Sequence, residues 1–397
     1  MAAKVPEVLD LAKWTIATRE EVVAMYQPGR PKKKGAWLAI RKSLRPIDLY
    51  CYLRARFGQP NGLQTFLRKD DSDNIFHWDY NIKCNGVDVH IAATSREMYF
   101  AISEKLSDED WKALILALKK DFGKFGKEKG AVQHSLEKWV VFQNKFALLA
   151  DLCADLHSNI SNLAPVGDLF EQITKERNTK RYATLQKKLS KRAVDLYGDC
   201  LKLKLLTPVM AEAFINHLIL IFCKDEIRAD KEKYDAFIRE KIPERLALLS
   251  TNCKGFAKPI GQTGEPYSSF KRVMDKRNFA IHGNVDPVRE QIETVYFEGK
   301  MPIFVNNGDH ILSFFTQQEL IADPAQTLAD YEAVHLFLAE VMDCLDLRSL
   351  EYMRVLSEDP YPGYEVNMKR VTKILPGHNV ATRFKGMRFD DDLKVKW

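Results

Sequence analysis

The 397-residue sequence lacks two features that would narrow its class at once: closely spaced cysteines and a long uninterrupted apolar run. Its seven cysteines are scattered, which argues against a disulfide scaffold or a cysteine-rich zinc module and favours a reducing compartment. The longest apolar stretch, residues 214–223, is interrupted by Asn216 and His217 and is shorter than the roughly 20 residues that cross a bilayer. We therefore expect a cytoplasmic protein with no membrane partner.

The sequence also lacks nucleotide-binding and metal-binding patterns. The Gly-Lys pairs at 123–124 and 126–127 are not followed by Ser or Thr, so they fail as a phosphate-binding loop. His77, Cys84 and His90 have irregular spacings that do not suit zinc. We expect no metal and no cofactor. The net charge of +6 is mild, and it permits a polyanionic partner without requiring one.

The N-terminal third has the patterns of a small α+β domain with an antiparallel sheet. Asn85-Gly86 lies between two apolar runs and predicts a hairpin, and Ser107 with Asp110 predicts a capped helix start. Helical spacing of apolar residues predicts another helix from Arg45 to Phe57. Alternation places Phe76, Trp78 and Tyr80 on one sheet face, packed against the helices. Short aromatic or β-branched segments predict strands at 65–67, 74–83, 87–92 and 98–102.

After a Gly/Lys-rich stretch at 123–130, which predicts a hinge, the pattern changes to long helices. Apolar residues recur three and four apart through residues 133–255, and Pro165, Pro208 and Pro243 are expected to mark helix breaks or first-turn positions. Further segments predict a helix at 267–282, a β-hairpin at 292–297 and 302–305, and a last helix from Asp323 to about Leu356.

The predicted fold class is therefore α+β, in three parts. Residues 1–130 form an N-terminal module of unknown role with a small antiparallel sheet. Residues 131–357 form a mainly α-helical bundle with a β-hairpin insert. Residues 358–397, which contain Pro, Gly, Arg and Lys, are expected to be a tail with one or two short strands.

The sharpest local pattern lies where the helix 267–282 is predicted to end. The sequence Asp275-Lys-Arg-Asn-Phe-Ala-Ile-His-Gly283 carries Arg277, Asn278 and His282. Asn278 and His282 are four residues apart and share a helix face, and the long Arg277 side chain can reach the same cleft. A guanidinium, an amide and a titratable imidazole suit phosphodiester cleavage in which the 2′-OH of RNA is the nucleophile. We expect these three residues to be catalytic and RNA to be the partner.

This Arg-polar-x-x-x-His pattern, late in a helical bundle, resembles the nuclease motif of HEPN domains (higher eukaryotes and prokaryotes nucleotide-binding). The resemblance covers about residues 133–356. It implies a metal-independent endoribonuclease that acts as a toxin or antiviral (abortive-infection) effector, with an inhibitor or sensor partner. It also implies a homodimer in which two motif helices face each other.

An upstream polar strip resembles the helix that packs beside the motif helix in that family. Its residues Glu212 and Asn216 are expected to line the cleft, although two residues four apart can equally be a helix-surface pair. Neighbouring apolar residues are expected to supply the dimer interface: Phe214, Leu218, Ile221 and Phe222.

Other interpretations of the motif stay open. Arg277, Asn278 and His282 can form a capping cluster at a helix end, with Arg277 in a surface ion pair. The domain can also be a non-catalytic HEPN-like subunit for dimerisation, nucleic-acid binding or sensing in a defence complex.

A second charged feature precedes the motif. Residues 174–192 hold eight cations against one acid, Glu176, and a helix so charged can follow a phosphate backbone or can simply be a solvated face. The candidate RNA-binding residues are Lys180, Arg181, Lys187, Lys188, Lys191 and Arg192.

Overall fold

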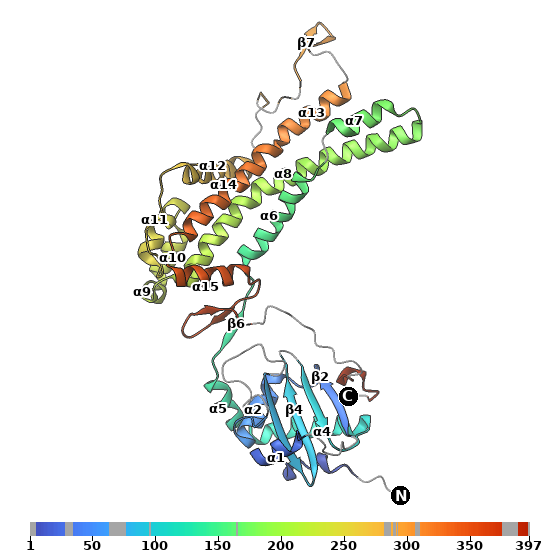
Figure 1. The fold of residues 1–397 in the computed structure, drawn as a ribbon, viewed down its shortest axis with the longest axis vertical. Helices are drawn as coiled ribbons and strands as arrows, with labels where there is room; N and C mark the ends of the chain where they lie inside the picture. Colours follow the sequence, from blue (N-terminus) through green and yellow to red (C-terminus); the bar gives the residue numbers. More distant parts are fainter. Residues whose placement is uncertain are drawn as a thin grey trace. The chain divides into compact units, whose positions relative to one another are not determined.

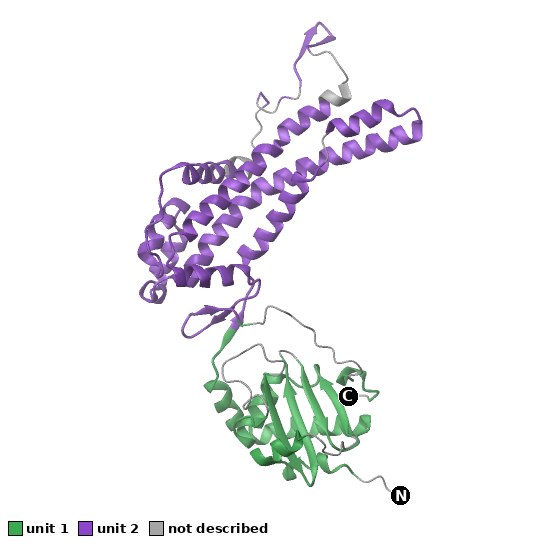
Figure 2. Ribbon diagram, viewed as in Figure 1, with its two compact units in different colours: residues 1–139, 374–397 green, residues 140–373 purple. Residues whose placement is uncertain are grey.

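The fold is α+β and divides into two compact units, residues 1–139 with 374–397 and residues 140–373 (Figures 1 and 2). The computed structural model describes residues 5–27, 35–62, 77–94, 97–163, 166–281, 287–288, 291, 293–305, 310–374 and 388–395. Of residues 278–281 and 310–313 it describes the backbone only. The first unit holds the five-stranded sheet, and the second is mainly helical.

The first unit is built on an antiparallel sheet with the strand order β1-β3-β4-β5-β2. Its strands are β1 (Thr15–Ile16), β2 (Ala36–Ile40), β3 (Trp78–Cys84), β4 (Val87–Ala93) and β5 (Met98–Ile102). Its helices are α1 (Arg19–Met25), α2 (Pro46–Phe57), α4 (Asp108–Lys124) and α5 (Gly126–Ser135). The predicted segment 65–67 lies outside the described residues.

Local chemistry explains several of these elements. Asn85 and Gly86 have φ angles of 47° and 81°, as a tight turn between β3 and β4 requires, so the predicted hairpin is confirmed. The Ser107 hydroxyl accepts from the backbone N–H of Asp110, whose carboxylate accepts from the N–H of Ser107. This capping box begins α4 where the sequence predicts a helix start.

One face of the sheet forms the core of this unit. Tyr80, Ile91 and Phe100 are fully buried there, and they belong to one apolar cluster with Tyr52 of α2 and Trp111 of α4. Trp78 packs on the edge of the same cluster. The predicted packing of this face on the helices is therefore confirmed for Trp78 and Tyr80, whereas Phe76 lies outside the described residues.

The expected C-terminal tail is divided between the two units: its first part, with two short strands at Gly363–Glu365 and Val371–Thr372, belongs to the second unit, and residues 374–397 belong to the first. Phe389 bridges β2 at Ala39, and Leu393 is buried in the core. The Asp390 carboxylate accepts hydrogen bonds from the backbone N–H groups of Arg41, Lys42 and Ser43 and from the Ser43 hydroxyl. A carboxylate that is 1% exposed and bonded this way fixes the end of the chain to the sheet.

The second unit is organised around α8 (Thr179–Phe222), against which α6 (Lys145–Ser161), α12 (Glu265–Ile281) and α14 (Pro324–Met342) pack (Figure 1). Near the N-terminal half of α8 lie α7 (Val166–Lys175) and α13 (His310–Ala322). The shorter helices are α9 (Asp225–Ala229), α10 (Lys231–Arg239), α11 (Ile242–Asn252) and α15 (Leu347–Glu358). The strands are β6 (Trp139–Val141), β7 (Val295–Glu298), β8 (Met301–Phe304), β9 (Gly363–Glu365) and β10 (Val371–Thr372).

Four expectations differ from this arrangement. The expected hinge at 123–130 lies largely in α5, which packs on α2, where Lys129 pairs with Asp48 at 3.4 Å. The predicted helical region 133–255 contains a strand, β6, and α6 begins only after the capping residue Asn144. Pro208 does not break a helix but lies inside the 44-residue α8. The last predicted helix is two helices, α14 and α15.

Candidate active site

Three helices bring a cluster of charged side chains together at the C-terminal half of α8. This helix contributes Glu212 and Asn216, α11 contributes Arg245, and α12 contributes Arg277. Helix α12 packs on α8, so the motif helix lies beside the polar strip as the sequence led us to expect. We call these four residues the Glu212 cluster.

A single carboxylate links the two arginines of the Glu212 cluster. Nη2 of Arg245 donates to Oε1 of Glu212 at 2.6 Å, and Nη1 of Arg277 donates to Oε2 at 3.3 Å. The second amino group of Arg245 donates to Oδ1 of Asn216 at 2.7 Å. With two guanidinium charges and one carboxylate, the cluster carries a net positive charge.

The two arginines differ in exposure. The Arg245 side chain is 5% exposed, whereas the Arg277 side chain is 26% exposed. The Nε atoms of both are buried and lack a hydrogen-bond acceptor among the described residues. Arg245 is therefore an internal support for Glu212, and Arg277 is the guanidinium that a ligand can approach.

Glu212 remains ionised at neutral pH. Its partial burial acts to raise the pKa of the carboxyl, but the hydrogen bonds and charges of Arg245 and Arg277 outweigh this and hold the pKa below its usual value. An ionised Glu212 fixes the Arg277 guanidinium by one amino group, and the partly exposed end of that guanidinium can face an anion.

The motif residues are described to different extents. Arg277 is described with its side chain, and it lies in the last turns of α12. Asn278 is described as a position of the same helix, but its side chain lies outside the described residues, as does the whole of His282. The structure therefore brings Arg277 to Glu212, whereas Asn216 bonds to Arg245, and the position of His282 stays a prediction.

Arg245 was not singled out from the sequence. The available signal was its position four residues before Leu249, which places a cation on the apolar face of a short helix. A cation on such a face requires a buried acid or amide, and here Glu212 and Asn216 supply both.

The apolar residues next to Glu212 do not supply a dimer interface. Phe214, Leu218 and Phe222 are buried in the core of the helical unit, and Ile221 packs against the same core. This expectation is therefore wrong, because the bundle itself covers these side chains. His217 is also turned inward: its ring donates to the Leu356 backbone carbonyl of α15, and its Nε2 lacks a partner among the described residues.

The six candidate RNA-binding cations separate into two groups. Arg192 is buried, and its two amino groups donate to the carboxylate oxygens of Glu319 on α13 at 3.0 and 3.1 Å. Arg192 therefore joins two helices and is not a surface cation. The exposed residues are Lys180, Arg181, Lys187, Lys188 and Lys191.

Within the described part of the chain, no group of three or more His, Cys, Asp or Glu residues is placed to hold a metal ion. By length and composition α8 could cross a membrane, but half of its apolar window is buried inside the helical unit, as in the central helix of a bundle. No family model, no curated protein and no solved structure matches this chain. The site must therefore be interpreted from its own chemistry.

Proposed function

We propose that the protein is a metal-independent endoribonuclease of the HEPN type, acting as a toxin or antiviral effector in the cytoplasm. The observation that supports this most is the Arg277 guanidinium, which is partly exposed and is held by an ionised Glu212 at the end of the motif helix. A fixed cation of this kind suits the charge that develops on phosphoryl oxygens during cleavage.

The proposed reaction uses only groups of the protein and of the RNA. His282 removes the proton of a 2′-OH, the freed oxygen attacks the adjacent phosphorus, and the bond to the 5′ oxygen breaks. The leaving oxygen takes a proton from a protonated imidazole. The products are a 2′,3′-cyclic phosphate and a 5′-OH. Arg277 stabilises the phosphoryl oxygens, and Asn278 is expected to position the same group.

One imidazole cannot accept and donate a proton at the same moment, so we propose a composite site in a homodimer. Two motif helices that meet across a two-fold axis supply two His282 and two Arg277 side chains. The helical unit also exposes apolar side chains suited to an interface, among them Leu148 and Leu152 of α6.

A second candidate function has its own observation. Because Arg277 is already paired with Glu212, the Glu212 cluster can be purely structural, and the helical unit is then a non-catalytic subunit for binding or sensing. The two functions differ in whether Arg277 and His282 are needed for RNA cleavage.

The deciding experiment incubates the purified protein with RNA in EDTA and identifies the new ends. We expect cleavage with a 2′,3′-cyclic phosphate, and we expect His282→Ala to reduce the rate at least about a hundredfold. Activity that requires added Mg²⁺, or equal cutting of an all-deoxy strand, would contradict the proposal. Equal activity of His282→Ala would favour the non-catalytic function.

The composite site is tested by mixing. Heterodimers of the wild-type chain with a His282→Ala chain should lose far more than the half of the activity that independent sites would lose. A protein that is strictly monomeric by light scattering and still cleaves RNA would refute the composite site and leave the nuclease proposal intact.

A further inference from the structure

Helix α8 carries on its outer face a row of exposed cations. At about 100° per residue, Lys180, Lys187 and Lys191 fall within about 40° of one another and lie opposite the buried Leu189. Arg181 and Lys188 flank them, and we call these five residues the cation row. All five are exposed, and none forms an ion pair with any acid in the described ranges.

The buried side of the same helical segment is different. There both amino groups of Arg192 donate to the carboxylate of Glu319 on α13. The charge of this buried cation is therefore neutralised where the two helices pack together. On the outer face, Lys187 and Lys191 are like charges four residues apart, which destabilises a helix. A bound polyanion removes this repulsion. The position of the five cations is therefore better explained by binding of a ligand than by a role in stabilising the fold.

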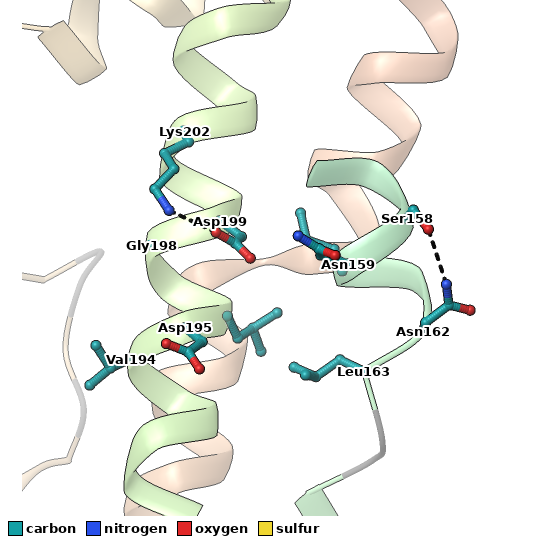
Figure 3. Close-up of a pocket in the computed structure, with 11 residues that line it drawn as sticks. Ser158, Asn159, Asn162, Leu163, Val194, Asp195, Gly198, Asp199 and Lys202 are labelled. Carbon is teal, nitrogen blue, oxygen red and sulfur yellow. Dashed lines mark hydrogen bonds and ion pairs between the residues drawn. The ribbon is translucent and has the colours of Figure 1, made fainter. Parts of the chain in front are cut away.

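Farther along α8, a hollow of about 530 Å³ lies between this helix and the end of α6 (Figure 3). Its floor is Gly198, where an added Cβ would meet nothing within 4 Å. Asn159 of α6 supplies an amide group, whereas the Asn162 amide donates to the Ser158 hydroxyl at 3.1 Å and Val194 points away from α6 (Figure 3). The hollow is therefore roomy, and Asn159 offers an amide that can pair with a planar polar ligand.

The acidic side chains of the hollow decide which part of a nucleic acid it suits. Asp195 and Asp199 line it, and Asp199 is neutralised by Lys202 at 2.9 Å. Carboxylates repel a phosphate but accept hydrogen bonds from the amino groups of bases, and amides pair with base edges. The hollow therefore suits an unstacked base, and the phosphates belong on the cation row.

The row, the hollow and the Glu212 cluster lie along one face of α8. On an ideal helix, positions 180, 187, 191, 212 and 216 fall within about 60° around the axis. Lys191 and Glu212 are 21 residues apart, which is about 30 Å along the helix. A ligand that contacts both the row and Arg277 must therefore be a strand several nucleotides long.

We propose that this face of α8 binds single-stranded RNA, with phosphates on the cation row and one unstacked base in the hollow above Gly198. The inference rests on the proposed function, since it assigns the surface that delivers the substrate to Arg277. Binding is then salt-dependent through the row and selective for single strands through the hollow.

The test measures RNA affinity separately from cleavage, by fluorescence anisotropy of a labelled 20-nucleotide single strand with His282→Ala protein. In that background Lys187→Glu, Lys188→Glu and Lys191→Glu together should weaken binding at least about thirtyfold and reduce the salt slope by about two. A matched control makes the same charge change at exposed lysines elsewhere in the helical unit: Lys231→Glu, Lys241→Glu and Lys258→Glu. Equal affinities of the two triple variants would overturn the proposal.

The hollow has its own variants. Gly198→Phe fills it and should weaken binding of the single strand about tenfold without weakening binding of a duplex, because stacking of one base is lost. Gly198→Ala, whose methyl group meets no atom, should weaken binding much less. An unchanged affinity of Gly198→Phe would overturn the base site. If wild-type protein binds RNA through the row but cuts none, the nuclease proposal fails and the binding surface remains.

Discussion

Two hydrogen-bonded carboxylates, one in each unit, show how differently the same chemical group can be used. Asp390 in the first unit is 1% exposed and accepts four hydrogen bonds, three of them from fixed backbone N–H groups. Glu212 in the second unit is about one-third exposed and holds two arginine side chains. A buried carboxylate whose hydrogen-bond donors are mostly fixed backbone groups stabilises the fold. A partly exposed carboxylate that holds an arginine side chain in place prepares a site for a ligand.

The largest effect is expected from removal of the Asp390 carboxylate. Asp390→Ala leaves three backbone N–H groups and a hydroxyl without their acceptor, and we expect the first unit to lose about 3–4 kcal/mol of unfolding free energy. Thermal unfolding followed by tryptophan fluorescence measures this. Asp392→Ala, which removes an exposed carboxylate of the same segment, is the control and should cost less than about 1 kcal/mol. Equal losses would contradict the special role of Asp390.

The next effect concerns acid stability of the second unit. Burial lowers the pKa of His217 from 6.5 to about 4, so between these values the unfolded chain binds a proton that the folded chain does not. Stability is therefore complete above pH 6.5 and falls as the pH drops, by about 3 kcal/mol at pH 4. Urea unfolding at pH 7 and pH 4 measures the loss of unfolding free energy between the two pH values. This loss should be smaller in His217→Gln than in the wild-type protein. The exposed His134→Gln is the control, and an unchanged acid loss in His217→Gln would refute the assignment.

The role of the Glu212 carboxylate is tested by removing its partly exposed partner, Arg277. Arg277→Ala should reduce RNA cleavage at least about a hundredfold, or about 2.7 kcal/mol of transition-state stabilisation, with little change in Tm. Single-turnover cleavage of a short RNA measures the rate. Arg272→Ala on the exposed face of the same helix is the matched control. If Arg277→Ala unfolds the protein, the result favours the interpretation that the Glu212 cluster is purely structural.

The smallest expected effect removes the amide from the Glu212 cluster. Asn216→Ala takes one acceptor from the buried Arg245, and we expect it to cost about 1 kcal/mol of stability and severalfold in cleavage rate. Chemical unfolding and the cleavage assay measure the two losses. Asn162→Ala, an exposed C-cap on α6, is the control for losing an amide. A larger stability loss than that of Asp390→Ala would reverse the comparison between the two carboxylates.

Local signals in the sequence predicted much of the first unit. The Asn85-Gly86 turn, the Ser107 cap and the alternation of Trp78 and Tyr80 each act over a few residues, and the structure has all three. Strand β2 was missed because its partner β5 lies about sixty residues away, and nothing near Ala36 marks the pairing. The attachment of Asp390 to Ser43 was missed for the same reason, since 347 residues separate the two.

In the second unit, tertiary packing overrode local signals. Pro208 predicts a break, but the packing of α6, α12 and α14 on α8 keeps the helix continuous around it. Glu212 and Asn216 could be named from their spacing and from the motif. Arg245 could not, because its role depends on α11 folding back onto α8, which no short-range pattern specifies.

The attachment of residues 388–395 to the first unit also sets an order of events during synthesis. The sheet begins within the first forty residues, but the segment that closes its edge is made only after the whole helical unit. Because domains fold as they leave the ribosome, the helical unit with the Glu212 cluster is complete while the first unit still waits for Asp390 and Leu393. Any ligand or partner that depends on a finished first unit therefore meets the chain only after Arg277 is in place.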